Sequence, residues 1–408
     1  MRRIWLISKY CRLPAEGEFP ARGFSLLREM VRLGCDCTLI TARHEWSVEN
    51  FGVAPACEVK IINGVRVVSL NVLRYDRAKS LRRILGWIHF ELKVLFLRLA
   101  DIPRPDVVIA SSLSLLSVFN GLRLRRVFRC LFVFEVRDIW PLILTENGGF
   151  SRRNVFVRLL GWVESIGYRY ADRIVGTMPN LGAHVRNVLG YDRRVDCIPM
   201  GLPEELVVDG DVDVPSSLDR SFPKAEFVVT HAGSIGIDNA LGTLFDAARL
   251  LKGDPRIAFF VIGKGDLLGH YKELCRDLPN VVFANPVQNK SVQPVLKRSS
   301  VLYFAAHPTV VLSFGQSLNK LIDYMYSGRP VIGSFSGFPS MINEADCGEL
   351  VPAGDAEALA RALKMWSTKD PELLRAVGER GRDWVVRNRS YRKLAVDYLS
   401  VMGIDAKA

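Results

Sequence analysis

The sequence lacks three features that would assign it to a simple class of protein. None of its eight cysteines belongs to a C-x-x-C pair, so neither a zinc site nor a disulfide framework is indicated, and we expect reduced thiols. Its six histidines do not cluster at ligand spacings, so no metal site is predicted. Its most membrane-like segment, residues 84–100, is interrupted by charged side chains and falls short of the ~20 apolar residues of a membrane span. These absences favour a cytoplasmic protein.

An excess of positive charge is confined to one half of the chain. Residues 1–200 contain 31 Lys and Arg against 18 Asp and Glu, whereas the remaining residues contain 24 against 25. Such a surface suits phosphates, anionic lipid headgroups or nucleic acid, and an ordinary solvated surface is the alternative. No interleaved aromatic residues or recognition helix accompany the charge, so we expect no nucleic-acid partner.

The length and the order of apolar segments predict two α/β domains. A chain of 408 residues exceeds one ordinary core. Strand and helix patterns alternate, which is typical of parallel sheets. The predicted fold class is therefore α/β, with two doubly wound Rossmann-like domains facing each other across a cleft. The expected strands are 3–8, 37–41, a hairpin over 59–70, 106–110, 130–136, 173–177, 226–233, 257–263, 280–285, 301–306 and 330–334.

Composition places the domain boundaries. We expect an N-terminal domain over residues 1–198, followed by a Pro-, Ser- and Asp-rich linker over 199–225. The C-terminal domain is expected over 226–385, with a last segment, 386–408, whose helix returns to the N-terminal domain. The D-x-D of DGDVDV at 209–214 is interpreted as solvated linker, because it does not follow a strand.

The stretch SLNKLIDYMYSGRPVIGS, residues 317–334, predicts a helix followed by a turn and a strand. The backbone N–H groups of a first helical turn have no intrahelical partners and stabilise an anion. Leu318, Asn319 and Lys320 would direct their amides at a phosphate, and Asp323 would accept hydrogen bonds from vicinal hydroxyls such as those of a ribose. An ordinary amphipathic helix with an exposed Lys and Asp is the alternative.

Several motifs together resemble one enzyme family. The run from Phe314 through SLNKLIDYMYSGRPVI, followed by Glu344 and CGELVPAGDAEALARAL, resembles the C-terminal signature of family 4 retaining glycosyltransferases, which have the GT-B fold. VFEVRDIWPLILTENGGF, YRYADRIVGTMPN and IPMG are similar to the branch that includes bacterial L-fucosamine transferases of surface-polysaccharide assembly. The resemblance covers nearly the whole chain.

The resemblance implies a set of donor-side residues. The diphosphate would rest on the amides at 318–320, and Asp323 would hold the ribose where a Glu is usual. THAGSIG (230–236) and GKG (263–265) correspond to the family's glycine-rich turns, and the base would lie near Pro286 and Val287. The implied donor-side residues are Gly233, Ser234, Asn239, Lys264, Val287, Leu318, Asn319, Lys320 and Asp323.

Three departures from the common family pattern involve four positions. Gly315 stands where a carboxylate often contacts the donor sugar, which suggests a deoxy sugar or other contacts. Ser234 and Asn239 replace an Arg and a Lys that often neutralise the diphosphate, and Arg137-Asp138 replaces a His-Asp pair. Some other group must therefore balance roughly two charges on the leaving diphosphate.

We expect Lys320 and Arg137 to supply that charge from opposite walls of the cleft, and Asp138 to orient the acceptor or cap the next turn. An ion pair of Arg137 with Glu135 or Asp138 is the structural alternative. The family's retaining mechanism implies neither a protein nucleophile nor a metal cofactor.

Acceptor contacts are expected in the loop 11–24. Arg12 and Arg22, with Glu16 and Gly17 between them, fall where the family contacts its acceptor, and guanidinium groups suit a lipid-linked diphosphate. Two solvated loop arginines are the alternative. Residues 74–99 combine basic and apolar residues, so they either pack on their own sheet, lie on an anionic membrane surface, or do both.

The sequence as a whole predicts a metal-independent, retaining glycosyltransferase of the hexosyl or N-acetylhexosaminyl type. The resemblance implies a nucleotide-sugar donor, with UDP favoured, and a lipid-linked or oligosaccharide acceptor in bacterial O-antigen, capsule or exopolysaccharide biosynthesis. Its expected place is the cytoplasm or the inner face of the cytoplasmic membrane. A sugar-nucleotide epimerase of the same fold is the alternative, although Gly315 and Arg137 remove groups that its acid/base chemistry needs.

Overall fold

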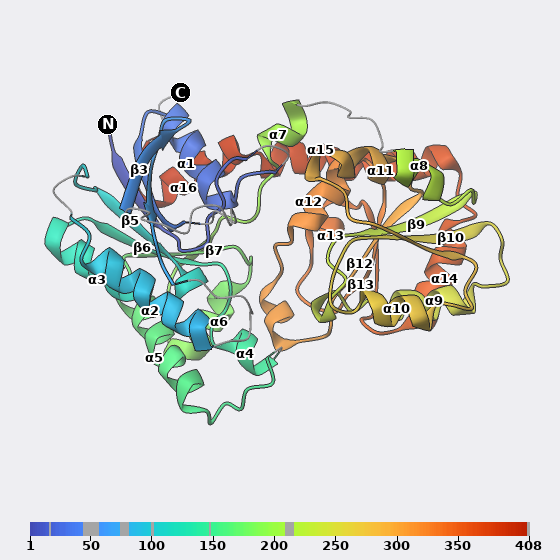
Figure 1. The fold of residues 1–408 in the computed structure, drawn as a ribbon, viewed down its shortest axis with the longest axis horizontal. Coiled ribbons are helices and arrows are strands. Elements are labelled where there is room, and N and C mark those ends of the chain that lie inside the picture. Colours follow the sequence, from blue (N-terminus) through green and yellow to red (C-terminus); the bar gives the residue numbers. More distant parts are fainter. Residues whose placement is uncertain are drawn as a thin grey trace. The chain divides into compact units, whose positions relative to one another are not determined.

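The computed structural model describes residues 1–15, 18–43, 57–73, 81–98, 102–146, 148–208 and 216–405. It divides into two compact units (Figure 1). The first unit holds most of residues 1–199 together with the segment from Tyr391 onwards, and the second holds Met200–Ser390. Glu16, Gly17 and the D-x-D at 209–214 lie outside the described residues.

The first unit is built on a sheet in the order β3-β4-β2-β1-β5-β6-β7-β8. Its described strands are parallel except β3, which forms a hairpin with β4. The strands are β1 Arg3–Ile7, β2 Asp36–Ala42, β3 Cys57–Ile62, β4 Val65–Leu70, β5 Val107–Ser111, β6 Leu131–Val136, β7 Arg173–Gly176 and β8 Val195–Cys197.

Helices cover both faces of this sheet because its strands bury alternate residues on each side. Leu6 packs in one core with α1 and α16, whereas Trp5 and Ile7 pack in the other with α2. Helix α16 lies beside α1 although they are far apart in the sequence (Figure 1). The helices are α1 Arg22–Arg32, α2 Leu81–Leu95, α3 Ser117–Phe128, α4 Leu142–Glu146, α5 Val155–Tyr170, α6 Leu181–Leu189 and α16 Tyr391–Val401, with a 3-10 turn η2 at Ser112–Ser114.

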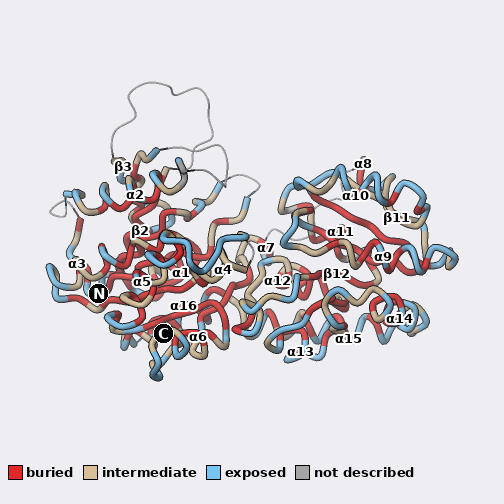
Figure 2. The backbone as a smooth tube through the Cα atoms, turned by 90° about the horizontal axis from the view of Figure 1, so that it is seen from below, coloured by how far each residue is buried: buried red, intermediate tan, exposed pale blue. Residues whose placement is uncertain are grey.

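The second unit has a wholly parallel sheet in the order β11-β10-β9-β12-β13-β14. Figure 2 shows in red that buried residues follow the strands in both units. Alternation again divides the core, since Val229 packs on one face of the sheet and Val228 on the other. The strands are β9 Phe227–Ala232, β10 Ile257–Ile262, β11 Val281–Ala284, β12 Val301–Ala305, β13 Val331–Ser334 and β14 Gly348–Val351.

Short helices precede this sheet and longer ones cover it. The segment 199–225, expected to be a linker, contains α7 and α8. The helices of the unit are α7 Glu204–Val208, α8 Ser216–Ser221, α9 Gly242–Leu250, α10 Leu268–Leu274, α11 Val292–Arg298, α12 Asn319–Tyr326, α13 Met341–Ala345, α14 Ala356–Trp366 and α15 Pro371–Arg389, with 3-10 turns η3 Ile237–Asn239, η4 Asn289–Ser291 and η5 Val310–Phe314.

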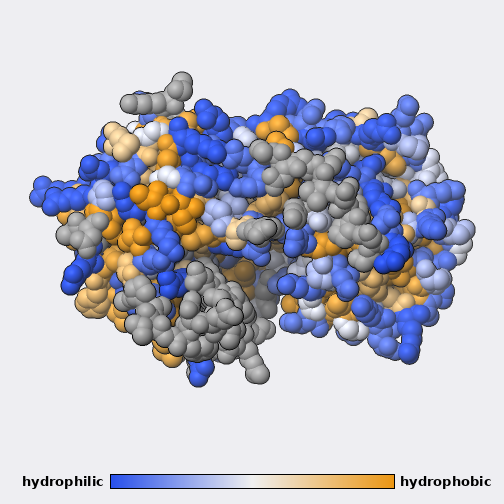
Figure 3. All heavy atoms as spheres, turned by 45° about the horizontal axis from the view of Figure 1, so that its top comes forward, coloured by the Kyte–Doolittle hydropathy of each residue, from blue (hydrophilic) through white to orange (hydrophobic). Residues whose placement is uncertain are grey.

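The predicted fold class of two doubly wound Rossmann-like domains is confirmed. In each sheet the strand order reverses beside the first strand, next to β1 and β5 in one unit and β9 and β12 in the other. Ligands of such sheets bind outside the carboxyl ends of the strands at this reversal. No helix among the described residues is both long and apolar enough to cross a membrane. Figure 3 shows apolar atoms reaching the surface among hydrophilic ones.

Candidate functional site

The N-terminus of α12 lies at the edge of the second sheet where the strands end. Helix α12 connects the parallel strands β12 and β13, so it must begin at their carboxyl edge. Leu318, the residue before the helix, is extended, and its side chain makes no capping hydrogen bond to the first turn. The amides of this turn therefore keep their hydrogen-bonding capacity for an external anion.

Lys320 brings three of the predicted residues together. Its Nζ donates a hydrogen bond to Oδ1 of Asn239, which stands at the end of η3. A Cβ added to Gly233 would lie 3.8 Å from the same Nζ, so the ammonium lies over the turn that follows β9. Burial lowers the pKa of Lys320 to about 8. The site thus holds a cation that is still mostly protonated at neutral pH and would gain from a nearby anion.

Asp323 presents a carboxylate one turn further along α12. Its side chain is only partly exposed, and it receives no hydrogen bond from the residues that the structure describes. Burial raises the pKa of Asp323 from 3.8 to about 7. A largely desolvated carboxylate without a donor is costly to the folded chain, and hydroxyl groups of a ligand would offset that cost.

Two buried side chains that the sequence did not single out fix the position of α12. The hydroxyl of Tyr324 accepts from the amide of Ala232, 2.8 Å away, and donates to the carbonyl of the same residue at 3.0 Å. Gln293 of α11 donates from Nε2 to the carbonyl of Asp323 at 2.8 Å. The helix is therefore held against the end of β9. Tyr324 lies within the quoted DYMY run, but nothing in that run indicates its partner.

His231, within the THAG motif, was also not predicted as a site residue. Its Nδ1 lies 3.2 Å from the carbonyl oxygen of Tyr303, and its Nε2 lies 3.4 Å from that of Ser234. Burial and, after it, the charge of Lys320 lower the pKa of His231 to about 3. The imidazole is therefore neutral, which leaves the charge at this point to Lys320.

Glycines allow the turns after β9 and β10 to pack against each other. A Cβ on Gly263 would lie 1.7 Å from the carbonyl oxygen of Gly233, and one on Gly265 would lie 2.2 Å from that of Ile235. Both Gly233 and Gly263 have a positive φ, of 148° and 155°. The amide of Ile235 donates to the carbonyl of Lys264 at 2.9 Å and so joins the two turns.

The backbone conformation at position 315 favours glycine over a residue with a carboxylate side chain. Gly315 ends η5 with φ 100° and ψ 175°, a conformation that residues with a side chain rarely adopt. A glutamate could not replace it without strain or a different loop. The remaining donor-side predictions fall on the same unit: Ser234 and Lys264 are exposed in the two glycine turns, Asn319 is exposed at the start of α12, and Val287 is half-buried after β11.

Arg137 and Asp138 follow β6 at the carboxyl edge of the first sheet. The hydroxyl of Ser112 accepts from the amide of Arg137 at 2.9 Å and from that of Asp138 at 3.3 Å. Of the alternative partners expected for Arg137, Glu135 forms an ion pair with Arg22, and the charge of Arg137 also acts on it. The backbone of both predicted residues is thus fixed at the strand end.

Arg22, expected on the acceptor side, is 1% exposed. Its Nη1 lies 2.7 Å from Oε1 of Glu135, and its other nitrogens donate to the carbonyls of Ile198 and Pro199. Burial would raise the pKa of Glu135, but the charges of Arg22 and Arg137 together with hydrogen bonds from Arg22 and Tyr398 outweigh it, and the pKa lies below its usual value. Arg22 therefore has a structural part in the first unit, whereas Arg12 is exposed.

Comparison with known proteins assigns the family. Residues 226–368 match the model described as glycosyl transferases group 1, and residues 24–201 match the glycosyl transferase 4-like domain. The two matches together cover most of the chain. The chain is a glycosyltransferase of the GT-B type. A search of curated proteins finds no match to its sequence.

Solved structures share the fold of this glycosyltransferase at low sequence identity. Sucrose-phosphate synthase from Thermosynechococcus elongatus is 17% identical with a TM-score of 0.68, and the match covers 98% of each chain. An Escherichia coli structure, described as trehalose-6-phosphate bound with UDP-2-fluoro glucose, is 13% identical with a TM-score of 0.72, covering 99% and 100%. A glycosyltransferase from Rickettsia africae is 14% identical with a TM-score of 0.61, covering 98% and 97%.

Proposed function

We propose that this glycosyltransferase transfers a hexosyl or N-acetylhexosaminyl group from a UDP-sugar, with retention and without a metal. The acceptor we propose is a lipid-linked or oligosaccharide intermediate of bacterial O-antigen, capsule or exopolysaccharide biosynthesis. The resemblance to L-fucosamine transferases and the glycine at position 315 favour a deoxy amino sugar as the group transferred.

One observation carries the donor assignment: an uncapped helix start, an ammonium and a carboxylate without a partner among the described residues occur within two turns of α12. The amides of residues 318–320 and Nζ of Lys320 suit a diphosphate, and the carboxylate of Asp323 suits the two ribose hydroxyls. The UDP-2-fluoro glucose bound in the similar E. coli structure supports uridine as the nucleoside.

The proposed chemistry asks little of the protein beyond charge and position. The bond from the sugar's anomeric carbon to the diphosphate breaks, and the acceptor oxygen bonds to that carbon on the same face. Lys320 and the helix start stabilise the charge that develops on the leaving diphosphate. Its departing oxygen takes the proton of the acceptor hydroxyl. Arg137 and Asp138 are the residues of the first unit proposed to contact the substrates.

A thermal-shift panel of UDP, GDP, dTDP and their sugars tests the donor assignment. A ligand at 100 times its Kd stabilises a protein by about 2.7 kcal/mol, which is readily seen as a rise in Tm. We expect UDP and UDP-sugars to raise the Tm of the wild type but not of the Asp323→Ala variant. If no nucleotide shifts the Tm, the proposed donor class is wrong. Steady formation of an epimer without acceptor would instead favour the epimerase, which the family matches do not support.

A further inference from the structure

Helices α2, α3 and α5 form one layer on the first unit. Contacts link α2 to α3 and α3 to α5, and Figure 1 shows the three side by side below the sheet. Helix α2 packs Phe90 against strand residues, and the ring of Tyr168 of α5 lies 5.6 Å from that of Phe134 in β6. The outer surface of this layer, away from the sheet, would ordinarily be polar.

That outer surface is instead rich in large apolar side chains. Val155, Leu159, Trp162 and Tyr170 are 80%, 50%, 55% and 52% exposed. Their spacing places them along a single outward stripe of α5. Helix α2 repeats the arrangement with Leu85, Ile88 and Leu92, and Phe119 of α3 packs its ring 6.0 Å from that of Trp162. We name this outward surface of α2, α3 and α5 the helical face.

The charges of the helical face have one sign. The acidic residues in these three helices are Glu91 and Glu164, and both are buried. Glu91 accepts hydrogen bonds from Ser114, Ser117 and Asn120, so it does not reach the surface. Exposed arginines, by contrast, occur on α3 and α5, with Arg126 and Arg158 as examples. Mixed apolar and basic side chains without exposed carboxylates complement an anionic, partly apolar surface.

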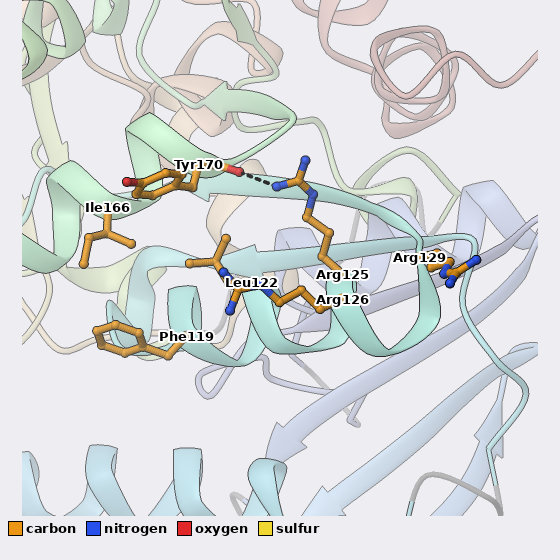
Figure 4. Close-up of a pocket in the computed structure, with 7 residues that line it drawn as sticks. All are labelled: Phe119, Leu122, Arg125, Arg126, Arg129, Ile166 and Tyr170. Atoms are coloured by element: carbon orange, nitrogen blue, oxygen red, sulfur yellow. Dashed lines mark hydrogen bonds between the residues drawn. The ribbon is translucent and has the colours of Figure 1, made fainter.

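A groove of about 470 Å³ lies within the helical face between the ends of α3 and α5. Its basic lining residues are Arg125, Arg126 and Arg129, and Figure 4 shows Arg125 pointing towards Tyr170 while Arg129 lies at the far end of α3. Arg125 is held by the carbonyl of Tyr170 at 3.2 Å and by Asp172 at 2.5 Å. Arg126 and Arg129 are exposed, and no carboxylate among the described residues pairs with them.

The rest of the groove is apolar. Phe119 and Leu122 of α3 line it together with Ile166 and the ring of Tyr170 from α5 (Figure 4). Guanidinium groups bind phosphate oxygens well, and aromatic rings favour the boundary between headgroups and acyl chains. The groove therefore matches the phosphate of an anionic lipid together with the first part of its tail.

We propose that the helical face docks the glycosyltransferase on an anionic phospholipid bilayer, with Arg126 and Arg129 contacting lipid phosphates. The proposal rests on the proposed function in one respect, since a lipid-linked acceptor gives the enzyme a reason to work at a bilayer. It also relocates the predicted membrane contact of residues 74–99, of which 74–80 lie outside the described residues. Helix α2 packs on its sheet and shares the outward surface, but the arginines proposed to bind phosphate are Arg126 of α3 and Arg129 directly after it.

The groove is remote from the proposed chemistry of the first unit. Arg129 precedes β6 and Tyr170 precedes β7, so the groove lies at the edge where the strands begin. Arg137 and Asp138 follow β6 and lie at the opposite edge. Changes in the groove should therefore leave Arg137 and Asp138 unaltered. The nucleotide is proposed to bind at α12 of the second unit, so its binding should also be unaltered.

Vesicle sedimentation tests the proposal with phosphatidylcholine vesicles that contain or lack phosphatidylglycerol. The wild type should bind only the anionic vesicles, and binding should weaken with added salt. Arg126→Glu combined with Arg129→Glu should weaken binding at least roughly thirtyfold, since each basic residue at such a surface contributes a factor of several. Trp162→Ser should weaken binding to the same vesicles by roughly tenfold through lost apolar burial.

A matched control reverses two charges on the second unit, with Lys272→Glu and Arg387→Glu, both exposed. This control variant has the same net charge as the Arg126→Glu, Arg129→Glu variant. It should nevertheless bind the anionic vesicles as strongly as the wild type does. Equal losses in both double variants would show a diffuse charge effect and overturn the docking site. Absence of binding to anionic vesicles by the wild type would overturn it as well. The UDP-induced rise in Tm, measured on all variants, reports separately on the proposed donor site.

Discussion

At the scale of single residues, the candidate site holds charges that the folded chain tolerates at a cost. Lys320 and Asp323 are both displaced by burial towards their neutral forms, with pKa values of about 8 and about 7. A binding site for an anion and two hydroxyls needs groups in this state, because the ligand restores the interactions that burial removed.

Asp323→Asn should stabilise the unliganded protein at about pH 8 by roughly 1–3 kcal/mol, after allowance for its partial exposure. The folded-state pKa is raised, so the wild type loses stability as the pH rises from the unfolded value through about 7. The advantage of the variant should shrink towards about pH 4, where both states are protonated. Urea unfolding at the two pH values measures it. A variant less stable than the wild type at both would refute the burial of this charge.

Lys320→Met should weaken UDP binding by roughly tenfold to a hundredfold, the usual range for loss of a charged hydrogen bond. The wild-type affinity should also fall as the pH rises through about 8, because Lys320 then loses its proton. Calorimetric titration across this pH range measures both effects, with Lys272→Met as the exposed control. A pH dependence that persists in Lys320→Met would assign it to another group.

Arg22→Ala should destabilise the first unit by about 3–5 kcal/mol, since it leaves the buried Glu135 without its cation. Denaturant unfolding measures this loss. The sequence suggested an acceptor-side role for Arg22, and that role predicts a different outcome, namely weaker acceptor binding by a protein of normal stability.

At the scale of elements, glycines in the turns after β9 and β10 determine how closely these two turns pack against each other. Gly263→Ala should destabilise the protein by at least about 3 kcal/mol, because its Cβ would overlap the carbonyl of Gly233 at a positive φ. Gly269→Ala, where a Cβ in α10 meets nothing within 4 Å, should be neutral or stabilise by up to about 1 kcal/mol. Thermal unfolding of the pair measures the contrast, and equal behaviour would show that the turn adapts.

The strand pattern was largely readable from the sequence, and the exceptions have physical causes. The buried strands of both sheets are mainly apolar runs, such as VVIAS of β5 and IAFFVI of β10, which the sequence exposes directly. Strands β8 and β14 were not predicted because they are short edge strands of mixed composition, VDC and GELV. The hydrogen bonds of Tyr324 and Gln293 were also out of reach, since they join segments separated by 92 and 30 residues.

At the scale of the whole molecule, the donor site stays a prediction that rests on two lines of sequence reasoning. Helix-end reasoning and family resemblance both selected residues 318–320 and 323. The structure places Lys320 beside Asn239 and Gly233 in the same unit. The sequence indicated residues 74–99, which contain α2, but not the outward stripes of α3 and α5, because those become visible only once the buried sides of these helices are known.

The central claim is that a nucleotide sugar binds at the start of α12, and a crystal structure with UDP tests it most directly. The account predicts diphosphate density within hydrogen-bonding distance of the amides of residues 318–320 and of Nζ of Lys320, with both ribose hydroxyls on Asp323. Ordered UDP bound elsewhere on the chain, with α12 free of ligand, would contradict it.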